Sequence, residues 1–104
     1  MDIKNTYLNS VNITVGAIVE EENRTLILGR VELSNYDARE LQVAPNFPIV
    51  VPVKREISRE SIRNANLEEG DTIHVVGTVV LTDICFVQNF ESMYVARRCL
   101  KTLV

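Results

Sequence analysis

The chain has no tryptophan, only one histidine, His74, and only two cysteines, Cys85 and Cys99. This set is too small and too widely spaced for a metal site, so we expect no metal ion and interpret both thiols as reduced, buried, small apolar side chains. His74 lies within an apolar stretch where no serine or acid can be placed beside it, which favours a structural histidine. The stretch from Gly70 to Gly77 lacks the lysine and the strand-to-helix context of a phosphate loop. These absences favour a protein that is not an enzyme and has no cofactor.

Long apolar runs are also lacking. No segment approaches the roughly 20 apolar residues that span a bilayer, and the first ten residues lack the basic start and apolar centre of a secretory signal. Neither sign of charge dominates, since 11 Lys and Arg stand against 14 Asp and Glu and leave a net charge of -3. We therefore expect a cytoplasmic protein, without a membrane segment, in which residues 1–104 form a single domain. Its net charge repels nucleic acid weakly as a whole.

Two segments, 10–19 and 24–33, predict an antiparallel hairpin, because apolar residues alternate in each. In the first, one face carries Val11, Ile13, Val15, Ala17 and Val19, and only Ile18 breaks the pattern. A glycine inside a strand is typical of a bulge or bend, which Gly16 therefore predicts. The second segment places Thr25, Ile27, Gly29, Val31 and Leu33 on one face and Arg24, Leu26, Leu28, Arg30 and Glu32 on the other.

The next region allows two interpretations. Residues 35–42 are compatible with a short helix capped by Asn35 or Asp37, whereas Pro45 and Pro48 favour a long loop across 34–48. A short strand follows at 49–53. It contains Pro52, whose missing N–H suits an edge strand or the end of a strand.

The second half predicts a helix and two more strands. Ser58 is suited to the N-cap of a short helix, and Gly70 to a left-handed residue at its C-terminus. Residues 71–81 form a strand with two largely apolar faces, which predicts a central position. Residues 82–92 are either a loop or a distorted hairpin arm, and 93–104 form the last strand. Arg97 and Arg98 are adjacent on that strand, so their side chains must diverge.

Three strands, a helix and two strands is the order of an OB fold. Three segments also resemble bacterial single-stranded DNA-binding proteins: NSVNITVGAIV (9–19), SIRNANLEEGDTIHVVGTVVL (61–81) and YVARRCLKTL (94–103). The first is similar to the opening strand of that family, the second to its helix and glycine-containing fourth strand, and the third to its closing strand. Primosomal replication proteins of the same barrel are similar in size. We expect an all-β, five-stranded OB-fold barrel with one short helix between strands 3 and 4.

OB folds generally bind ligands on strands 2 and 3 and on the loops between strands 1 and 2 and between strands 4 and 5. Binding a single strand requires cations for phosphates and aromatic faces for bases. The candidate cations are Arg24, Arg30, Lys54 and Arg55, and the candidate aromatics are Tyr36, Phe47, Phe86, Phe90 and Tyr94. Each also has a structural interpretation, because the arginines can pair with Glu20 or Glu32 and the phenylalanines can fill the core or a subunit contact.

Two hypotheses for function follow. The first is a binding protein for single-stranded nucleic acid, DNA or alternatively RNA, that is not sequence-specific and is accessory to DNA replication, repair or recombination. It would be a homo-oligomer, a dimer or a tetramer, because the exposed Leu26, Leu28 and 49–53 need covering. The second is an OB-like protein–protein interaction or assembly module without nucleic-acid binding. Strand order and the two arginines on one face of the second strand, Arg24 and Arg30, favour the first hypothesis. Net charge and the missing tryptophan favour the second.

Overall fold

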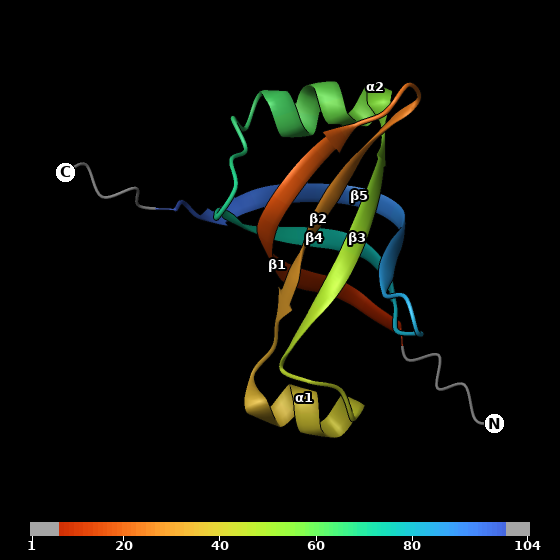
Figure 1. Cartoon of the computed structure of the whole chain (residues 1–104), viewed down its shortest axis with the longest axis vertical. Coiled ribbons are helices and arrows are strands. Elements are labelled where there is room, and N and C mark those ends of the chain that lie inside the picture. The colour runs from red at the N-terminus through yellow and green to blue at the C-terminus, as the bar shows by residue number, and fades with distance from the viewer. Residues whose placement is uncertain (1–6, 100–104) are drawn as a thin grey trace.

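Five strands close into a barrel in the computed structural model, which describes residues 7–99 (Figure 1). The strands are β1 (Tyr7–Glu20), β2 (Arg24–Glu32), β3 (Asn46–Lys54), β4 (Thr72–Val80) and β5 (Phe86–Arg97). Their order around the barrel is β1-β2-β3-β5-β4, and β4 pairs back onto β1. Between β3 and β4 the chain forms α2 (Arg55–Ser58), which continues into the π-helical turn η1 (Arg59–Arg63). This is the predicted five-stranded OB-like barrel.

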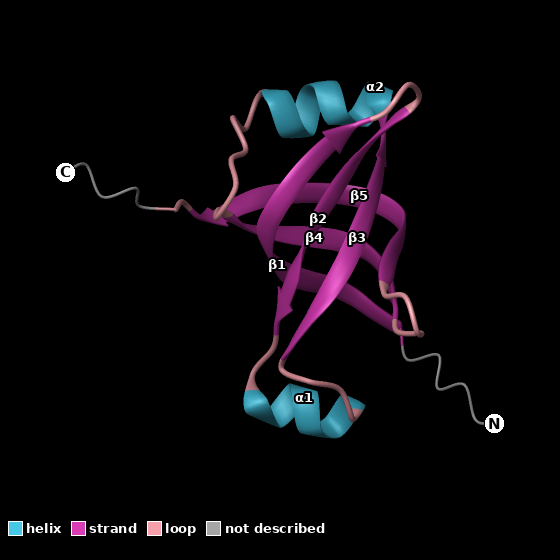
Figure 2. Ribbon diagram, viewed as in Figure 1, coloured by secondary structure: helices cyan, strands magenta, loops and turns pink. Residues whose placement is uncertain are grey.

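A second helix, α1 (Asn35–Leu41), lies between β2 and β3, so the helical interpretation of this region is confirmed. Its N-cap is Ser34, whose hydroxyl accepts a hydrogen bond from the Asp37 amide at 3.1 Å, and not Asn35 or Asp37. Figure 2 shows α1 at one end of the barrel and α2 with η1 at the other. Among residues 7–99, no helix is long and apolar enough to cross a membrane.

The core consists mainly of β-branched residues that alternate along the strands. Its most buried members are Ile13, Val15, Ile27, Val31, Ile49, Val51, Val53, Ile73, Val75 and Val79. The face assignment for β2 is therefore correct. In β1 the predicted bulge is present, because the pairing with β2 shifts between Val15 and Ala17. The extra residue reverses the alternation, so Ile18 packs against the core and Val19 is exposed, contrary to the sequence pattern.

The ends of β1 belong to different pairings. Residues 7–14 pair with β4, and residues 12–20 pair with β2, so only a short middle part pairs with both neighbours. β1 therefore contributes its first part to the pairing with β4 and its second part to the pairing with β2. The bulge lies just beyond the shared part and increases the local bend and twist.

The barrel closes most weakly between β3 and β5. Val50 and Phe86 form the one β-bridge, and the Val50 amide donates to the Cys85 carbonyl at 3.1 Å. Successive amides alternate in direction along a strand, so the nitrogens of Pro48 and Pro52 point to the same side as that of Val50. Because proline has no N–H, β3 offers only one donor across this stretch. We call this junction the seam.

Several element boundaries differ from the predictions. β3 begins at Asn46, before Pro48, and β5 begins at Phe86, so the distorted hairpin arm is the correct interpretation of this region. The helix after β3 begins at Arg55, and Ser58 is the N-cap residue of η1 only by position. Its hydroxyl donates to the Arg55 carbonyl at 2.9 Å and makes no capping hydrogen bond. Gly70 is left-handed, with φ of 90°, but lies beyond the helix in the turn into β4. Residues 100–104 of the predicted last strand lie outside the described residues.

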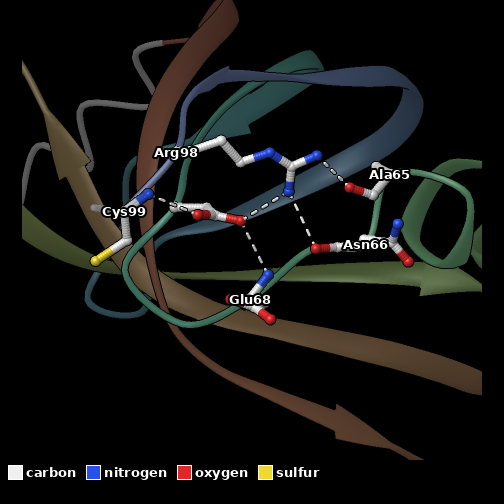
Figure 3. Close-up of polar contacts among 6 residues, drawn as sticks. Ala65, Asn66, Glu68, Arg98 and Cys99 are labelled. Atoms are coloured by element: carbon white, nitrogen blue, oxygen red, sulfur yellow. Dashed lines mark hydrogen bonds and ion pairs between the residues drawn. The ribbon is translucent and has the colours of Figure 1, made fainter. Parts of the chain in front are cut away.

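The carboxylate of Asp71 connects the turn before β4 to Arg98 and Cys99, which follow β5. Figure 3 labels its partners Glu68, Arg98 and Cys99. The Asp71 side chain is 3% exposed and accepts hydrogen bonds from the amides of Cys99 (2.8 Å) and Glu68 (3.0 Å). The Arg98 guanidinium lies 3.1 Å from the same carboxylate and also donates to the carbonyls of Ala65 and Asn66. Arg97 points instead to Glu32 and Thr72, so the two arginines diverge as predicted.

Candidate nucleic-acid interface

A groove with a volume of about 400 Å³ runs along the seam between the end of β3 and the start of β5. We call it the seam groove. Its lining comprises Arg24, Pro52, Val53, Lys54, Ile57, Phe86, Val87, Gln88, Asn89 and Phe90. Four candidates from the sequence, Arg24, Lys54, Phe86 and Phe90, therefore lie together, although they come from three strands. Gln88 and Asn89 are exposed amides beside them that the sequence pattern did not indicate.

The cations of the seam groove come from paired positions. Arg24 and Lys54 are opposite each other in the β2–β3 register, and both are exposed. Arg24 forms an ion pair with Glu21, with 2.6 Å between Nε and Oε1, while no other described residue binds the Lys54 ammonium. Arg55 follows Lys54 directly and donates from Nη2 to the Glu21 carbonyl at 3.2 Å. Arg55 and Lys54 share a second hollow with Glu22, Asn23 and Glu56, so acidic side chains border the cations.

The aromatic wall comes from the first part of β5. Phe86 and Phe90 are half-buried, so each presents part of its ring to the groove, and Phe90 also packs against the core. The chain bends between them, because Asn89 is left-handed with φ of 54° and the pairing with β4 shifts between Val76 and Thr78. Cations and aromatic side chains in one groove are the combination with which many proteins bind single-stranded nucleic acid.

The other candidates lie elsewhere. Phe47 is 8% exposed and belongs to the core, so its ring cannot serve as a stacking surface. Arg30 lies six residues along β2 from Arg24, or about 20 Å away, and donates to Asn46 at the α1 end of the barrel. Tyr36 is 72% exposed on α1. These two do not join the seam groove.

Tyr94 lies on the second half of β5, with 60% of the residue exposed, and is also outside the seam groove. Its ring is 5.1 Å from that of His74, measured between centroids. His74 Nδ1 lies 2.8 Å from the Asn12 side-chain oxygen, so β1, β4 and β5 are connected through this histidine. The geometry is that of a structural hydrogen bond.

A second, mainly apolar groove lies on the other side of the Val50–Phe86 bridge, with a volume of about 530 Å³. Its lining comprises Leu28, Gly29, Phe47, Pro48, Ile49, Val50, Asp83, Ile84 and Cys85. Ile84 is 71% exposed there, which the sequence pattern did not reveal because the residue lies in the loop between β4 and β5. We call this the apolar groove.

Cys85 is half-buried and Cys99 is exposed, so the expectation of two buried thiols is wrong for Cys99.

These features define an OB-like barrel with a cationic and aromatic groove along its seam. Comparison with models of known protein families, with curated proteins and with solved structures finds no similar protein. The resemblance to single-stranded DNA-binding and primosomal proteins therefore stays a prediction. Within residues 7–99, no three His, Cys, Asp or Glu side chains gather where they could hold a metal ion.

Proposed function

We propose that this chain binds single-stranded nucleic acid in the seam groove without sequence specificity. The proposed ligand is DNA. The observation that carries the proposal is the meeting of Arg24 and Lys54 with Phe86 and Phe90 in one groove. Phosphates would lie along the β2–β3 side and bases along the β5 side. The resemblance to replication proteins supports a role accessory to DNA replication, repair or recombination.

The net charge of -3 opposes this assignment only weakly, because phosphate contacts depend mainly on charges within about one Debye length, roughly 10 Å at 0.1 M salt. Lys54 is available for a phosphate, and Arg24 keeps guanidinium donors beyond the one that Glu21 occupies. The acidic Glu21 and Glu22 lower the local potential. Binding should therefore be weak at high salt and should rely on stacking for much of its affinity.

The salt dependence of binding tests the cationic wall. Fluorescence titration of labelled oligo(dT) at several salt concentrations should give a linear plot of log K against log salt. The double variant Arg24→Gln, Lys54→Gln should reduce its slope by about 1.4, because each phosphate contact to a single strand contributes about 0.7. Arg39→Gln, which removes an exposed charge from α1, should leave the slope unchanged. The same series with oligo(rU) distinguishes RNA from DNA.

Absence of oligo(dT) binding at low salt, in a sample with a cooperative melting transition, would refute the proposal. An unchanged slope in the double variant would mean that the phosphates do not contact the cations of the seam groove. The loss of one charge in Arg39→Gln, against two in the double variant, shows whether net charge alone changes the slope.

The second candidate function is an assembly module, and the apolar groove is the observation that favours it. Beside this groove, the outer face of the paired strands β2 and β3 presents Leu26, Leu28, Val50 and Pro52, which are half-buried and opposite each other in register. A contiguous apolar surface of this kind is typical of a protein contact. We propose that another subunit covers it, so that the chain forms a dimer or tetramer.

Leu28→Glu tests the assembly. A buried carboxylate without a partner is strongly unfavourable at an interface, so the variant should dissociate and its mass by light scattering should fall to that of one chain. Thr78→Glu, a half-buried outward position on β4, is the control and should keep the assembly. A wild-type protein that is already monomeric at about 100 μM, well above an ordinary micromolar Kd, would contradict this candidate.

A further inference from the structure

A small polar cavity lies under the helical segment, where α2 and η1 cover the ends of β1 and β2. Its volume is about 120 Å³, and its lining comprises Glu20, Thr25, Arg55, Ser58 and Arg63. Figure 1 shows α2 beside the turn between β1 and β2 at this end of the barrel. A single water molecule needs a cavity of only about 10–15 Å³, so this cavity has room for a tetrahedral oxyanion.

Two guanidinium groups dominate the chemistry of this cavity. Arg55 uses Nη2 for the Glu21 carbonyl, at 3.2 Å, and retains its other donors. No other described residue forms an ion pair or hydrogen bond with the Arg63 guanidinium. Among the described lining residues Glu20 is the only acid, so these charged groups sum to one positive charge. Such a pair of arginines fits a ligand with several oxygen acceptors.

The two remaining lining residues offer hydroxyl groups. Thr25 is 4% exposed and Ser58 is 6% exposed. The Ser58 hydroxyl now donates to the Arg55 carbonyl at 2.9 Å, and a hydroxyl rotates to suit its partners. The buried floor of the cavity is therefore polar, while its sides are cationic.

We propose that this cavity binds a phosphate group, held by Arg55 and Arg63 with the hydroxyls of Thr25 and Ser58. Phosphate oxygens accept two parallel bonds from a guanidinium, which gives arginine an advantage over lysine at such a site. The attraction of a phosphate dianion to the two arginines would outweigh its repulsion from Glu20. The sequence pattern gave no sign of this site, since Thr25 and Arg63 are 38 positions apart.

The position of the cavity suggests the source of the phosphate. Arg55 lines both the cavity and the neighbouring hollow, and Lys54 lines both that hollow and the seam groove. The cations thus form a continuous series from Arg63 to Arg24. The terminal phosphate of a strand in the seam groove is one source, and this part rests on the proposed function. Free inorganic phosphate is the other.

Inorganic phosphate tests the site without nucleic acid. We expect ³¹P NMR titration to show saturable binding by the full chain at constant ionic strength, with affinity about tenfold lower in Arg63→Gln. Arg63→Lys should restore only part of the affinity, because lysine lacks the planar fork. Arg39→Gln should bind like the wild type. Melting curves of all variants establish that they are folded.

The second arm compares oligo(dT) carrying a 5′-phosphate, a 3′-phosphate or two terminal hydroxyls. Tighter binding of one phosphorylated oligonucleotide, with a preference lost in Arg63→Gln, supports a strand end as the ligand. Saturable inorganic phosphate without oligo(dT) binding supports the cavity and refutes only the proposed function. Absence of both inorganic phosphate binding and any end preference overturns the phosphate site, even if oligo(dT) itself binds.

Discussion

Replacing Asp71 with alanine is expected to lower the free energy of unfolding by about 2–3 kcal/mol. The carboxylate is buried, and its removal leaves the amides of Cys99 and Glu68 without their acceptor. An unsatisfied buried donor costs about 1–3 kcal/mol, and because both amide hydrogen bonds are part-buried, water would recover part of this cost. Arg98 would also lose its ion pair. The measurement is urea unfolding followed by circular dichroism, which gives the free energy for each variant.

The matched control is Asp83→Ala, because Asp83 is exposed in the loop between β4 and β5. It should change the free energy of unfolding by no more than about 0.5 kcal/mol. Arg98→Met removes the charge partner but leaves both amides bound, so its effect should be smaller than that of Asp71→Ala. If Asp71→Ala were as stable as Asp83→Ala, the connection between β5 and the turn before β4 would not contribute to stability.

The same carboxylate predicts a dependence on pH. Hydrogen bonding from the Cys99 amide holds the pKa of Asp71 below its ordinary value of 3.8; burial opposes this, and the Glu68 amide and Arg98 reinforce it. A carboxyl with a lowered pKa in the folded state stabilises the protein above the unfolded pKa and loses this contribution as pH falls through the folded pKa. The stability advantage of the wild type over Asp71→Asn should therefore be constant above about pH 5 and shrink below 3.8. A pH-independent advantage would contradict this account.

The alternation of apolar residues predicted the strands of the barrel well. Side-chain direction repeats every two residues, and one face of each strand packs into the core. The alternation predicted the wrong faces only beyond the β-bulge, where β1 contains one extra residue. At Gly16 the bulge exchanges the faces of Ile18 and Val19, a change that depends on the register with β2 and not on local sequence. Asp71 illustrates a second limit. Its partner Cys99 is 28 positions away, and only the closed barrel brings the two together.

The candidate site followed the same rule. Arg24 begins β2 and Lys54 ends β3, so the antiparallel register places them opposite each other. The sequence indicated both residues as candidates but grouped Arg24 with Arg30. Phe47 was wrongly included as a candidate because Pro48 favoured a loop before residue 49. Once β3 begins at Asn46, Phe47 has the same parity as Ile49 and Val51 and must point into the core. Strand parity therefore excludes it, and proline in an outward position of β3 is compatible with the strand.

Replacing both Phe86 and Phe90 with leucine is expected to weaken oligo(dT) binding by about 30-fold at constant salt. Each stacked base contributes about 1–3 kcal/mol, and leucine keeps part of the apolar contact but lacks an aromatic face, so we assign about 1 kcal/mol to each ring. A total of about 2 kcal/mol corresponds to this factor. Leucine is preferable to alanine because both residues are half-buried, and a truncated side chain would leave a cavity beside the core.

The salt dependence of the double variant distinguishes stacking from charge. Stacking releases no counterions, so the Phe86→Leu, Phe90→Leu protein should show weaker binding with the same slope of log K against log salt as the wild type. The Arg24→Gln, Lys54→Gln protein should show the opposite result, with a smaller slope. Tyr36→Leu, on α1 outside the seam groove, is the aromatic control and should bind oligo(dT) like the wild type. Equal weakening by Tyr36→Leu would mean that the strand follows the α1 end of β2, near Arg30, and that the seam groove is not its path.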